Sequence, residues 1–279
     1  MRISSISAKQ LFGIFDHTIP LNLGERITII FGPNGYGKTY LLSAVNALFN
    51  GTFDDLLNIP FTEFRVGFDN GSTVILGRKG NDPAGSFALS LTDSFGEKKP
   101  IGRREFAETF GREIHVRFIQ RDRLLYLSDT ELDRPAIVLY AARMRELASE
   151  PDDSMREKIG LFTRIINSRL NHKKISVDSE TGFAFATSAG AILSPEKLSS
   201  GEQHTVVILF NLLFDTEPDT LVMIDEPELS LHVFWQQQFI SDLAEIIGIG
   251  RFDALIATHS PQIIHDRWDL AVELKGPGE

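Results

Sequence analysis

The sequence predicts an α/β fold in which the strands of a parallel sheet end at a phosphate-binding loop. Three observations predict it. A glycine-rich loop, Gly32–Thr39, lies between an apolar run at 26–31 and a helical pattern at 40–49. Continuous apolar runs at 220–224 and 254–257 are typical of buried parallel strands, and each ends in polar residues. Short alternating runs separated by glycines at 64–91 indicate an additional antiparallel β subdomain.

The loop matches the pattern G-x-x-x-x-G-K-[ST], and a strand before it with a helix after it is the context this motif requires. The helix start contributes a partial positive charge. Lys38 can reach terminal phosphates, and the Thr39 hydroxyl can ligate Mg²⁺. The alternative, a chance match in a glycine-rich turn, is weakened by the matching motifs downstream. Four residues of the loop can turn backbone N–H groups toward a phosphate: Asn34, Gly35, Tyr36 and Gly37.

The remaining N-terminal elements follow in order. An opening strand with a bend at 11–15 is expected from residue 3, and a short strand is expected at 18–21. A short helix at 104–110 and a strand at 115–119 that enters the main sheet complete this part.

The middle of the chain, from about Leu132 to Leu170, reads as two short helices. The pair Ser154 and Glu157 predicts a capping box at the start of the second helix. A single domain over 1–279 is expected, made of an N-terminal lobe (1–131), a helical insertion (132–172) and a C-terminal lobe (173–279).

The C-terminal lobe opens with a hairpin pattern over 175–186. A long apolar helix follows from the Leu198–Gln203 segment to near Phe214, and another helix is expected from Trp235 through Phe239 to Ile247. The last strand is expected at 270–274.

Composition sets further limits. The 279 residues include no cysteine, which excludes disulfides and cysteine nucleophiles. A net charge of -10 argues against a protein coated in nucleic acid, although a local basic groove stays open. The N-terminus lacks the apolar core of a signal peptide, and no apolar stretch approaches the ~20 residues that span a bilayer. A cytoplasmic protein without a membrane partner is therefore expected.

Four short motifs, in this order, resemble those of the ATP-binding-cassette (ABC) ATPase superfamily. They are the phosphate loop, the segment Leu198–Gln203 (LSSGEQ), the strand that ends in Asp225 and Glu226, and the strand that ends in Thr258 and His259. The resemblance covers both ends of the chain and leaves 52–196 largely unmatched. It implies an ABC-ATPase head with a mixed central sheet, an N-terminal antiparallel β subdomain and a short helical insertion. It also implies ATP and Mg²⁺ as cofactors, sandwiched head to tail between two copies of the chain.

The resemblance assigns roles to individual residues. Asp225 would be a ligand or outer partner of Mg²⁺, and Glu226 would accept a proton from the attacking water or orient it. His259 would hydrogen-bond the γ-phosphate or that water. Ser200 and Gly201, at a helix start, would bind the γ-phosphate across the dimer. Taken singly, Asp225 and Glu226 also fit a strand-end turn, and His259 also fits a buried histidine whose hydrogen bonds are satisfied.

Other residues leave alternatives open. Gln120, after the strand at 115–119, is the best placed candidate for contact with Mg²⁺ and water, and an exposed polar strand end is the other interpretation. Phe12 and Phe15 fit either stacking on adenine or core packing, with core packing favoured. Five basic residues fit either solvated surface, which is favoured, or a polyanion-binding patch: Arg117, Arg121, Arg123, Lys173 and Lys174.

The segments 227–236 and 257–264 resemble the RecF, SMC and OLD branch, especially small ATPases of bacterial anti-phage defence. OLD proteins carry a nuclease after the ATPase, and here only a short stretch follows the last predicted strand, so a separate effector chain such as a nuclease is expected. Three functions stay open. They are an ATPase that gates a partner in defence, a RecF-like DNA repair or maintenance ATPase that binds nucleic acid, and the nucleotide-binding subunit of an ABC transporter.

Overall fold

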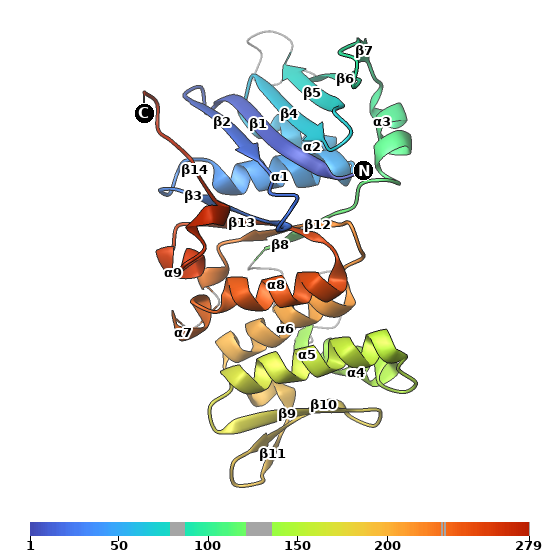
Figure 1. Cartoon of the computed structure of the whole chain (residues 1–279), viewed down its shortest axis with the longest axis vertical. Helices are drawn as coiled ribbons and strands as arrows, with labels where there is room; N and C mark the ends of the chain where they lie inside the picture. Colours follow the sequence, from blue (N-terminus) through green and yellow to red (C-terminus); the bar gives the residue numbers. More distant parts are fainter. Residues whose placement is uncertain (79–86, 121–135, 230, 232, 279) are drawn as a thin grey trace. The chain divides into compact units, whose positions relative to one another are not determined.

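The computed structural model describes residues 1–78, 87–120, 136–229, 231 and 233–278 (Figure 1). The chain forms two compact units. The first contains Met1–Phe118, Glu217–Glu226 and Arg251–Glu279, and the second contains Ile119–Thr216 and Pro227–Gly250. The domain boundaries expected from the sequence stay a prediction.

An antiparallel sheet of six strands lies in the first unit, in the order β2-β1-β4-β5-β6-β7 (Figure 1). Alternation explains its buried face, because every second side chain of a strand points the same way. On β2, for example, Phe15, His17 and Ile19 are buried while the residues between them are exposed. The strands are β1 (Ile3–Leu11), β2 (Phe15–Pro20), β4 (Glu63–Phe68), β5 (Thr73–Arg78), β6 (Phe87–Thr92) and β7 (Lys98–Pro100).

The second sheet of five strands has the order β14-β3-β13-β12-β8. β13 is buried along its whole length and β12 is buried up to its last residue, Asp225, as their continuous apolar sequence predicts. β3 pairs in parallel with β13 and β14, and β13 pairs in parallel with β12, so these four strands end at one edge. The strands are β3 (Ile27–Phe31), β8 (Val116–Ile119), β12 (Leu221–Asp225), β13 (Asp253–Thr258) and β14 (Ala271–Glu273).

Helix α1 (Lys38–Phe49) packs against β12 and β13, and its buried face joins a core that both sheets share. Aromatic rings fill part of this core: Phe106 lies 4.9 Å from Phe110 and 5.7 Å from Phe49, between ring centroids. The smaller helical elements of this unit are α2 (Phe53–Leu57), α3 (Arg103–Phe110), α9 (Pro261–Ile264) and the 3₁₀ turn η4 (Trp268–Leu270).

The second unit combines helices with a small sheet in the order β11-β10-β9. Helix α6 packs against α4, α5 and α8, while β9 packs on α5 and β10 on α4. The strands are β9 (Lys173–Asp178), β10 (Gly182–Thr187) and β11 (Ile192–Leu193). The helices are α4 (Ala136–Leu147), α5 (Asp153–Arg169), α6 (Ser200–Phe214), α7 (Val233–Gln236) and α8 (Phe239–Gly250), with 3₁₀ turns η2 (Pro195–Lys197) and η3 (Pro227–Leu229).

The predicted α/β fold class, with a parallel sheet and an antiparallel subdomain, is confirmed. The capping box predicted at Ser154 and Glu157 is wrong, because α5 begins at Asp153 and the Asp152 side chain accepts a hydrogen bond of 2.7 Å from the Met155 N–H. The helix start expected at 132–135 lies outside the described residues.

The single helix expected from Trp235 to Ile247 is also wrong, because two helices, α7 and α8, occupy this stretch. The Gln238 N–H donates to the Trp235 carbonyl at 3.2 Å, which makes a tight turn, and Arg169 from α5 donates to the Gln238 side chain and to Asp242. Gln236 donates to two carbonyls of the preceding segment and holds α7 against it. These side-chain hydrogen bonds lie at the break between α7 and α8, where apolar periodicity alone predicts one continuous helix.

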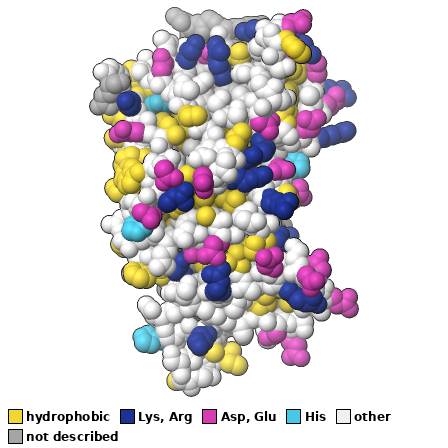
Figure 2. Space-filling model, in the orientation of Figure 1, with side chains coloured by type: hydrophobic (Ala, Val, Ile, Leu, Met, Phe, Trp, Pro, Cys, Tyr) yellow, Lys and Arg dark blue, Asp and Glu magenta, His cyan; other side chains and the backbone are white. Residues whose placement is uncertain are grey.

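Lys and Arg side chains are interspersed with Asp and Glu over the face seen in Figure 2. The acidic excess of the chain therefore does not gather into one broad field on this face. Within the described part of the chain, no helix is both long and apolar enough to cross a membrane.

Candidate active site

Two glycines with positive φ shape the phosphate loop. Gly35 has φ of 86° and Gly37 has φ of 85°, a conformation that glycine adopts at little cost. At Gly37 an added Cβ would lie 2.3 Å from Cδ2 of Leu11, so a side chain there would have to displace Leu11 in addition to straining the backbone. The loop therefore turns sharply into the start of α1, where backbone N–H groups have no partner within the helix.

Lys38, the first residue of α1, is buried. Its Nζ donates hydrogen bonds to the carbonyl of Gly32 at 2.6 Å and to that of Pro33 at 2.9 Å. The ammonium group thus lies against the first residues of the loop. A cation in this position can compensate the charge of a phosphate chain held by the loop.

Thr39 joins the loop to a neighbouring strand. Its Oγ1 donates a hydrogen bond of 2.8 Å to Oδ2 of Asp225, the last residue of β12. A hydroxyl and a carboxylate are oxygen ligands of the kind that Mg²⁺ prefers, with phosphates and waters completing the shell. In the described residues, this site included, no group of three or more His, Asp and Glu side chains is arranged to hold a metal by itself. The two side chains therefore fit a magnesium ion that ATP would help to hold.

Glu226 and His259 meet just beyond the ends of β12 and β13. Oε1 of Glu226 lies 3.4 Å from Nδ1 of His259, and both side chains are partly exposed. The Glu226 backbone has φ of 45°, and its N–H donates to the carbonyl of Ala257 at 2.8 Å. Positive φ in a residue with a Cβ costs about 1–3 kcal/mol and occurs mainly where surrounding contacts impose it, often at functional sites. Here that contact fixes the strand end that carries the carboxylate.

Lys38, Thr39 and Glu226 line a pocket of about 150 Å³ within the first unit. The carboxylate-bearing Glu226 therefore lies at the same hollow as Lys38 and Thr39. Its lining consists of Phe12, Asn34, Gly35, Gly37, Lys38, Thr39, Tyr40 and Glu226.

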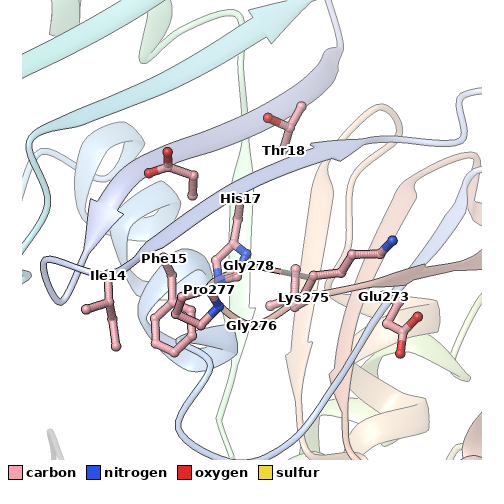
Figure 3. A pocket seen from close by; sticks show the side chains of 11 residues that line it. Ile14, Phe15, His17, Thr18, Glu273, Lys275, Gly276, Pro277 and Gly278 are labelled. Carbon is pink, nitrogen blue, oxygen red and sulfur yellow. The ribbon is translucent and has the colours of Figure 1, made fainter.

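A larger pocket, of about 470 Å³, lies between β2 and the segment 273–278 that follows β14 (Figure 3). His17 of β2 lines it and is buried, and its Nε2 lies 2.9 Å from the carbonyl oxygen of Tyr36 in the phosphate loop. Burial lowers the pKa of His17, while the Tyr36 carbonyl and the charge of Asp16 act in the opposite direction. A neutral imidazole, which can donate from Nε2, is thus favoured as a support of the loop.

The Leu198–Gln203 segment, below called the signature segment, belongs to the second unit and forms the start of α6. Ser199, not Ser200, is the N-cap: its side chain accepts from the Glu202 N–H, and the Glu202 carboxylate accepts from the Ser199 N–H in return. Ser200 is exposed and Gly201 is partly exposed in the first turn, where backbone N–H groups can receive an anion.

The other candidates fall in different places. Gln120 follows β8 directly, is half-buried and belongs to the second unit, so its contact with Mg²⁺ stays a prediction. Phe15 is buried and stacks on His17, as core packing predicts, whereas Phe12 lines the smaller pocket. Of the possible polyanion patch, Lys173 is engaged with Glu202, and Arg121 and Arg123 lie outside the described residues.

A phosphate loop, a carboxylate-ended strand beside it and a parallel sheet define a P-loop ATPase of the ABC and SMC type. The chain belongs to the family described as "AAA domain, putative AbiEii toxin, Type IV TA system", whose model matches residues 77–265. The expected ABC-type, SMC-like ATPase branch is thereby confirmed, while the RecF-like and OLD-like specifics stay predictions.

Several proteins are similar to this chain. Protein ea59 of Escherichia phage lambda is 25% identical over 291 aligned positions, which cover 94% of this chain and 52% of that protein. The chain therefore spans about half the length of this curated relative. A crystal structure of an SMC head bound to the C-winged helix domain of ScpA has a TM-score of 0.62 at 14% identity, covering 100% of this chain and 95% of that one.

A second SMC head has an extended coiled coil and is bound to the C-terminal domain of ScpA derived from Pyrococcus furiosus. It has a TM-score of 0.55 at 15% identity, covering 94% of this chain and 91% of that one. At these identities the two structures show a common fold.

Sequence reasoning missed two features of the site. His17 follows the alternation of β2 like any inward residue, so no local pattern marks it as a partner of the phosphate loop. The capping box of Ser199 and Glu202 has a sequence signal, S-x-x-E before an apolar run, that could have identified it.

Proposed function

We propose that this chain binds ATP with Mg²⁺ and hydrolyses it, and that two copies enclose the nucleotide. The observation that carries the proposal is the hydrogen bond between Thr39 and Asp225, beside the pair of Glu226 and His259. These four residues follow strands or a loop at one edge of a parallel sheet, which is the position where α/β proteins bind ligands.

Each side chain has a task in this proposal. The phosphate loop N–H groups bind the β-phosphate region, and Lys38 exchanges its carbonyl partners for phosphate oxygens. Thr39 and Asp225 would hold Mg²⁺, which would supply charge neutralisation to the phosphates. Glu226 accepts the proton of the attacking water, and His259 holds the carboxylate of Glu226 in place.

The signature segment completes the site from a second copy. Ser200 offers a hydroxyl, and Gly201 a backbone N–H, at the positive end of a helix of 15 residues. A γ-phosphate bound there links two chains, so ATP acts as part of the interface. Hydrolysis removes that link and opens the assembly.

The biological role that we infer is the gating of a separate effector protein in the contest between bacteria and phages. The family description, which names a putative toxin of a toxin–antitoxin system, and the phage relative support this setting. An SMC head bound to a domain of ScpA is an example of the same fold with a protein partner. Direct DNA maintenance is the alternative, and duplex binding that depends on ATP would favour it.

The variant Glu226→Gln tests the proposal. Gln keeps the size of the side chain but cannot accept a proton, so single-turnover hydrolysis should fall by about 10²–10⁴-fold. ATP binding should remain, and the variant should accumulate as a dimer with ATP in light scattering. Glu273→Gln is the matched control, because this exposed carboxylate ends β14, which lies at the far edge of the same sheet, and the change should leave hydrolysis unchanged.

Near-normal hydrolysis by Glu226→Gln would remove Glu226 from the chemistry and direct attention to His259 and Glu228. Slow hydrolysis without a change in assembly would keep the chemistry but contradict the link between hydrolysis and opening.

A further inference from the structure

We infer that Lys173, the first residue of β9, is a positioning residue that holds the signature segment in the conformation that receives ATP from a second copy. The inference rests on the proposed function and names a group on which the trans-acting half of the site depends.

The contact is close and well placed. Nζ of Lys173 donates to both carboxylate oxygens of Glu202, at 2.9 Å and 2.8 Å. The side chains are only 24% and 12% exposed, so this pair is less screened by water than a surface ion pair. A charge-assisted bond to two oxygens of one carboxylate fixes the orientation of that carboxylate.

Glu202 in turn fixes the segment before the helix. Its Oε2 accepts from the N–H of Ser199 at 2.8 Å and from the hydroxyl of Ser199 at 2.9 Å. Gln203 adds a second clamp, donating from its side chain to the carbonyls of Leu198 and Glu196. Ser200 and Gly201 lie between these two anchors, so the direction of their hydroxyl and N–H depends on both.

The ammonium group of Lys173 also compensates the negative charge of Glu202 in the signature segment. The carboxylate of Glu202 lies in the first turn of α6, beside the residues proposed to receive a phosphate of like sign. Desolvation of Glu202 opposes its ionisation, but hydrogen bonds from Lys173 and Ser199 outweigh it and lower the pKa of Glu202. The carboxylate is therefore ionised at neutral pH. Without the ammonium of Lys173 this charge would face an incoming γ-phosphate uncompensated.

The lysine stands on a rigid element. Lys173 pairs with Thr187 across the hairpin of β9 and β10, and Asn167 of α5 bonds both the N–H and the carbonyl of Ile175, two residues further on. Lys174, its neighbour, points to the other side of the strand and is exposed. The chain thus provides a matched control with the same residue type one position away.

The test compares Lys173→Met and Lys174→Met in the full chain. For Lys173→Met we expect ATP-dependent dimerisation, measured by sedimentation, to weaken by about tenfold, the scale of a lost charge-assisted hydrogen bond. ATP binding to the single chain, measured by calorimetry, should stay unchanged, because the phosphate loop is intact. Lys174→Met should behave like the unmodified chain, and Lys173→Arg should restore most of the dimerisation.

The double variant Lys173→Met with Glu202→Gln separates positioning from general stability. Gln can keep the capping box but carries no charge to neutralise. If Lys173 acts through Glu202, the Lys173→Met change should weaken ATP-dependent dimerisation much less when Glu202 is already Gln. Hydrogen exchange of the amides at 199–203 adds a local readout, expected to speed up in Lys173→Met and to slow again in Lys173→Arg.

Three outcomes overturn the inference. Lys173→Met could dimerise as the unmodified chain does, Lys174→Met could show an equal defect, or the defect could be the same size in the Glu202→Gln background. A different result marks failure of the proposed function itself: the unmodified chain would then bind ATP without any dimerisation, and Lys173 would have no assembly to control.

Discussion

The hydroxyl of Thr39 donates a 2.8 Å hydrogen bond to the carboxylate of Asp225, a residue 186 positions further along the chain. This bond connects the start of α1 to the end of β12 across the parallel sheet, in which β13 separates β12 from β3. Two oxygen atoms from distant segments are thereby held at the distance that a shared small cation requires.

ATP binding by the variant Thr39→Val should depend less strongly on Mg²⁺. Val keeps the shape of the side chain but has no oxygen, so it can neither ligate the ion nor bond Asp225. ATP affinity measured by calorimetry with EDTA should stay near that of the unmodified chain. The gain in affinity on adding Mg²⁺ should fall about tenfold or more, as for the loss of one charged contact. A full gain with Mg²⁺ would exclude Thr39 as a ligand.

Two inactive variants should restore activity when mixed. Lys38→Ala removes the cation of the phosphate loop, and Ser200→Arg blocks the signature segment, so neither homodimer can form a complete site. A mixed dimer contains one intact loop opposite one intact signature segment. ATP hydrolysis by the mixture should therefore exceed that of either variant alone. If chain exchange is demonstrated and no mixture exceeds the single variants, the site is not shared between copies.

His17 should make the stability of the chain depend on pH. Its pKa is lowered in the folded state, mainly by burial, whereas in the unfolded chain it has the ordinary value of about 6.5. As the pH falls through that value, His17 takes up a proton in the unfolded state but not yet in the folded state. The free energy of unfolding should therefore decrease from pH 7.5 toward pH 5.

The variant His17→Gln should flatten this dependence, because Gln can still donate to the Tyr36 carbonyl but does not titrate. Urea unfolding between pH 5 and 8 measures the slope. His172→Gln is the control, since His172 is exposed on the second unit. An unchanged slope in His17→Gln would assign the pH dependence to other groups.

The ion pair of Arg2 and Asp253 should contribute measurably to stability. Nε of Arg2 donates to Oδ2 of Asp253 at 2.8 Å, a second bond joins Nη2 to Oδ1, and the Asp253 side chain is 9% exposed. Arg2→Met leaves a nearly buried carboxylate whose other cationic neighbour, Arg26, is 4.0 Å away. We expect the free energy of unfolding to fall by about 2 kcal/mol.

Arg104→Met provides the contrast, since it breaks an exposed pair with Glu108 one helical turn away. This change should cost at most about 0.5 kcal/mol. Equal effects in the two variants would mean that burial does not decide the strength of these pairs.

Much of the fold and of the candidate site could be predicted because the relevant signals are local. The apolar run before Gly32 becomes β3, and the runs before Asp225 and His259 become β12 and β13. Buried parallel strands need continuous apolar sequence, and their ends are where polar residues first appear. The expected grouping of Thr39, Asp225 and Glu226 follows from that rule, although their chemical roles remain predictions.

The features that escaped prediction depend on contacts between distant residues. At the interruption between α7 and α8, Arg169 of α5 donates a hydrogen bond to the side chain of Gln238. His17 contacts a backbone carbonyl of the phosphate loop, and because every residue has a carbonyl, the sequence does not mark its partner. Lys173 resembles any surface lysine until β9 brings it to Glu202. Periodicity describes which face of an element is buried but not which polar group meets which.

The left-handed backbone of Glu226 lowers the stability of the fold at the position that carries the proposed catalytic carboxylate. Glycine would adopt φ of 45° without strain, so Glu226→Gly could raise the melting temperature while removing the carboxylate. A laboratory selection for heat resistance alone would thus enrich for inert chains here. Only a selection that also demands turnover would retain glutamate, and its persistence in an evolving population would then report that the reaction is in use.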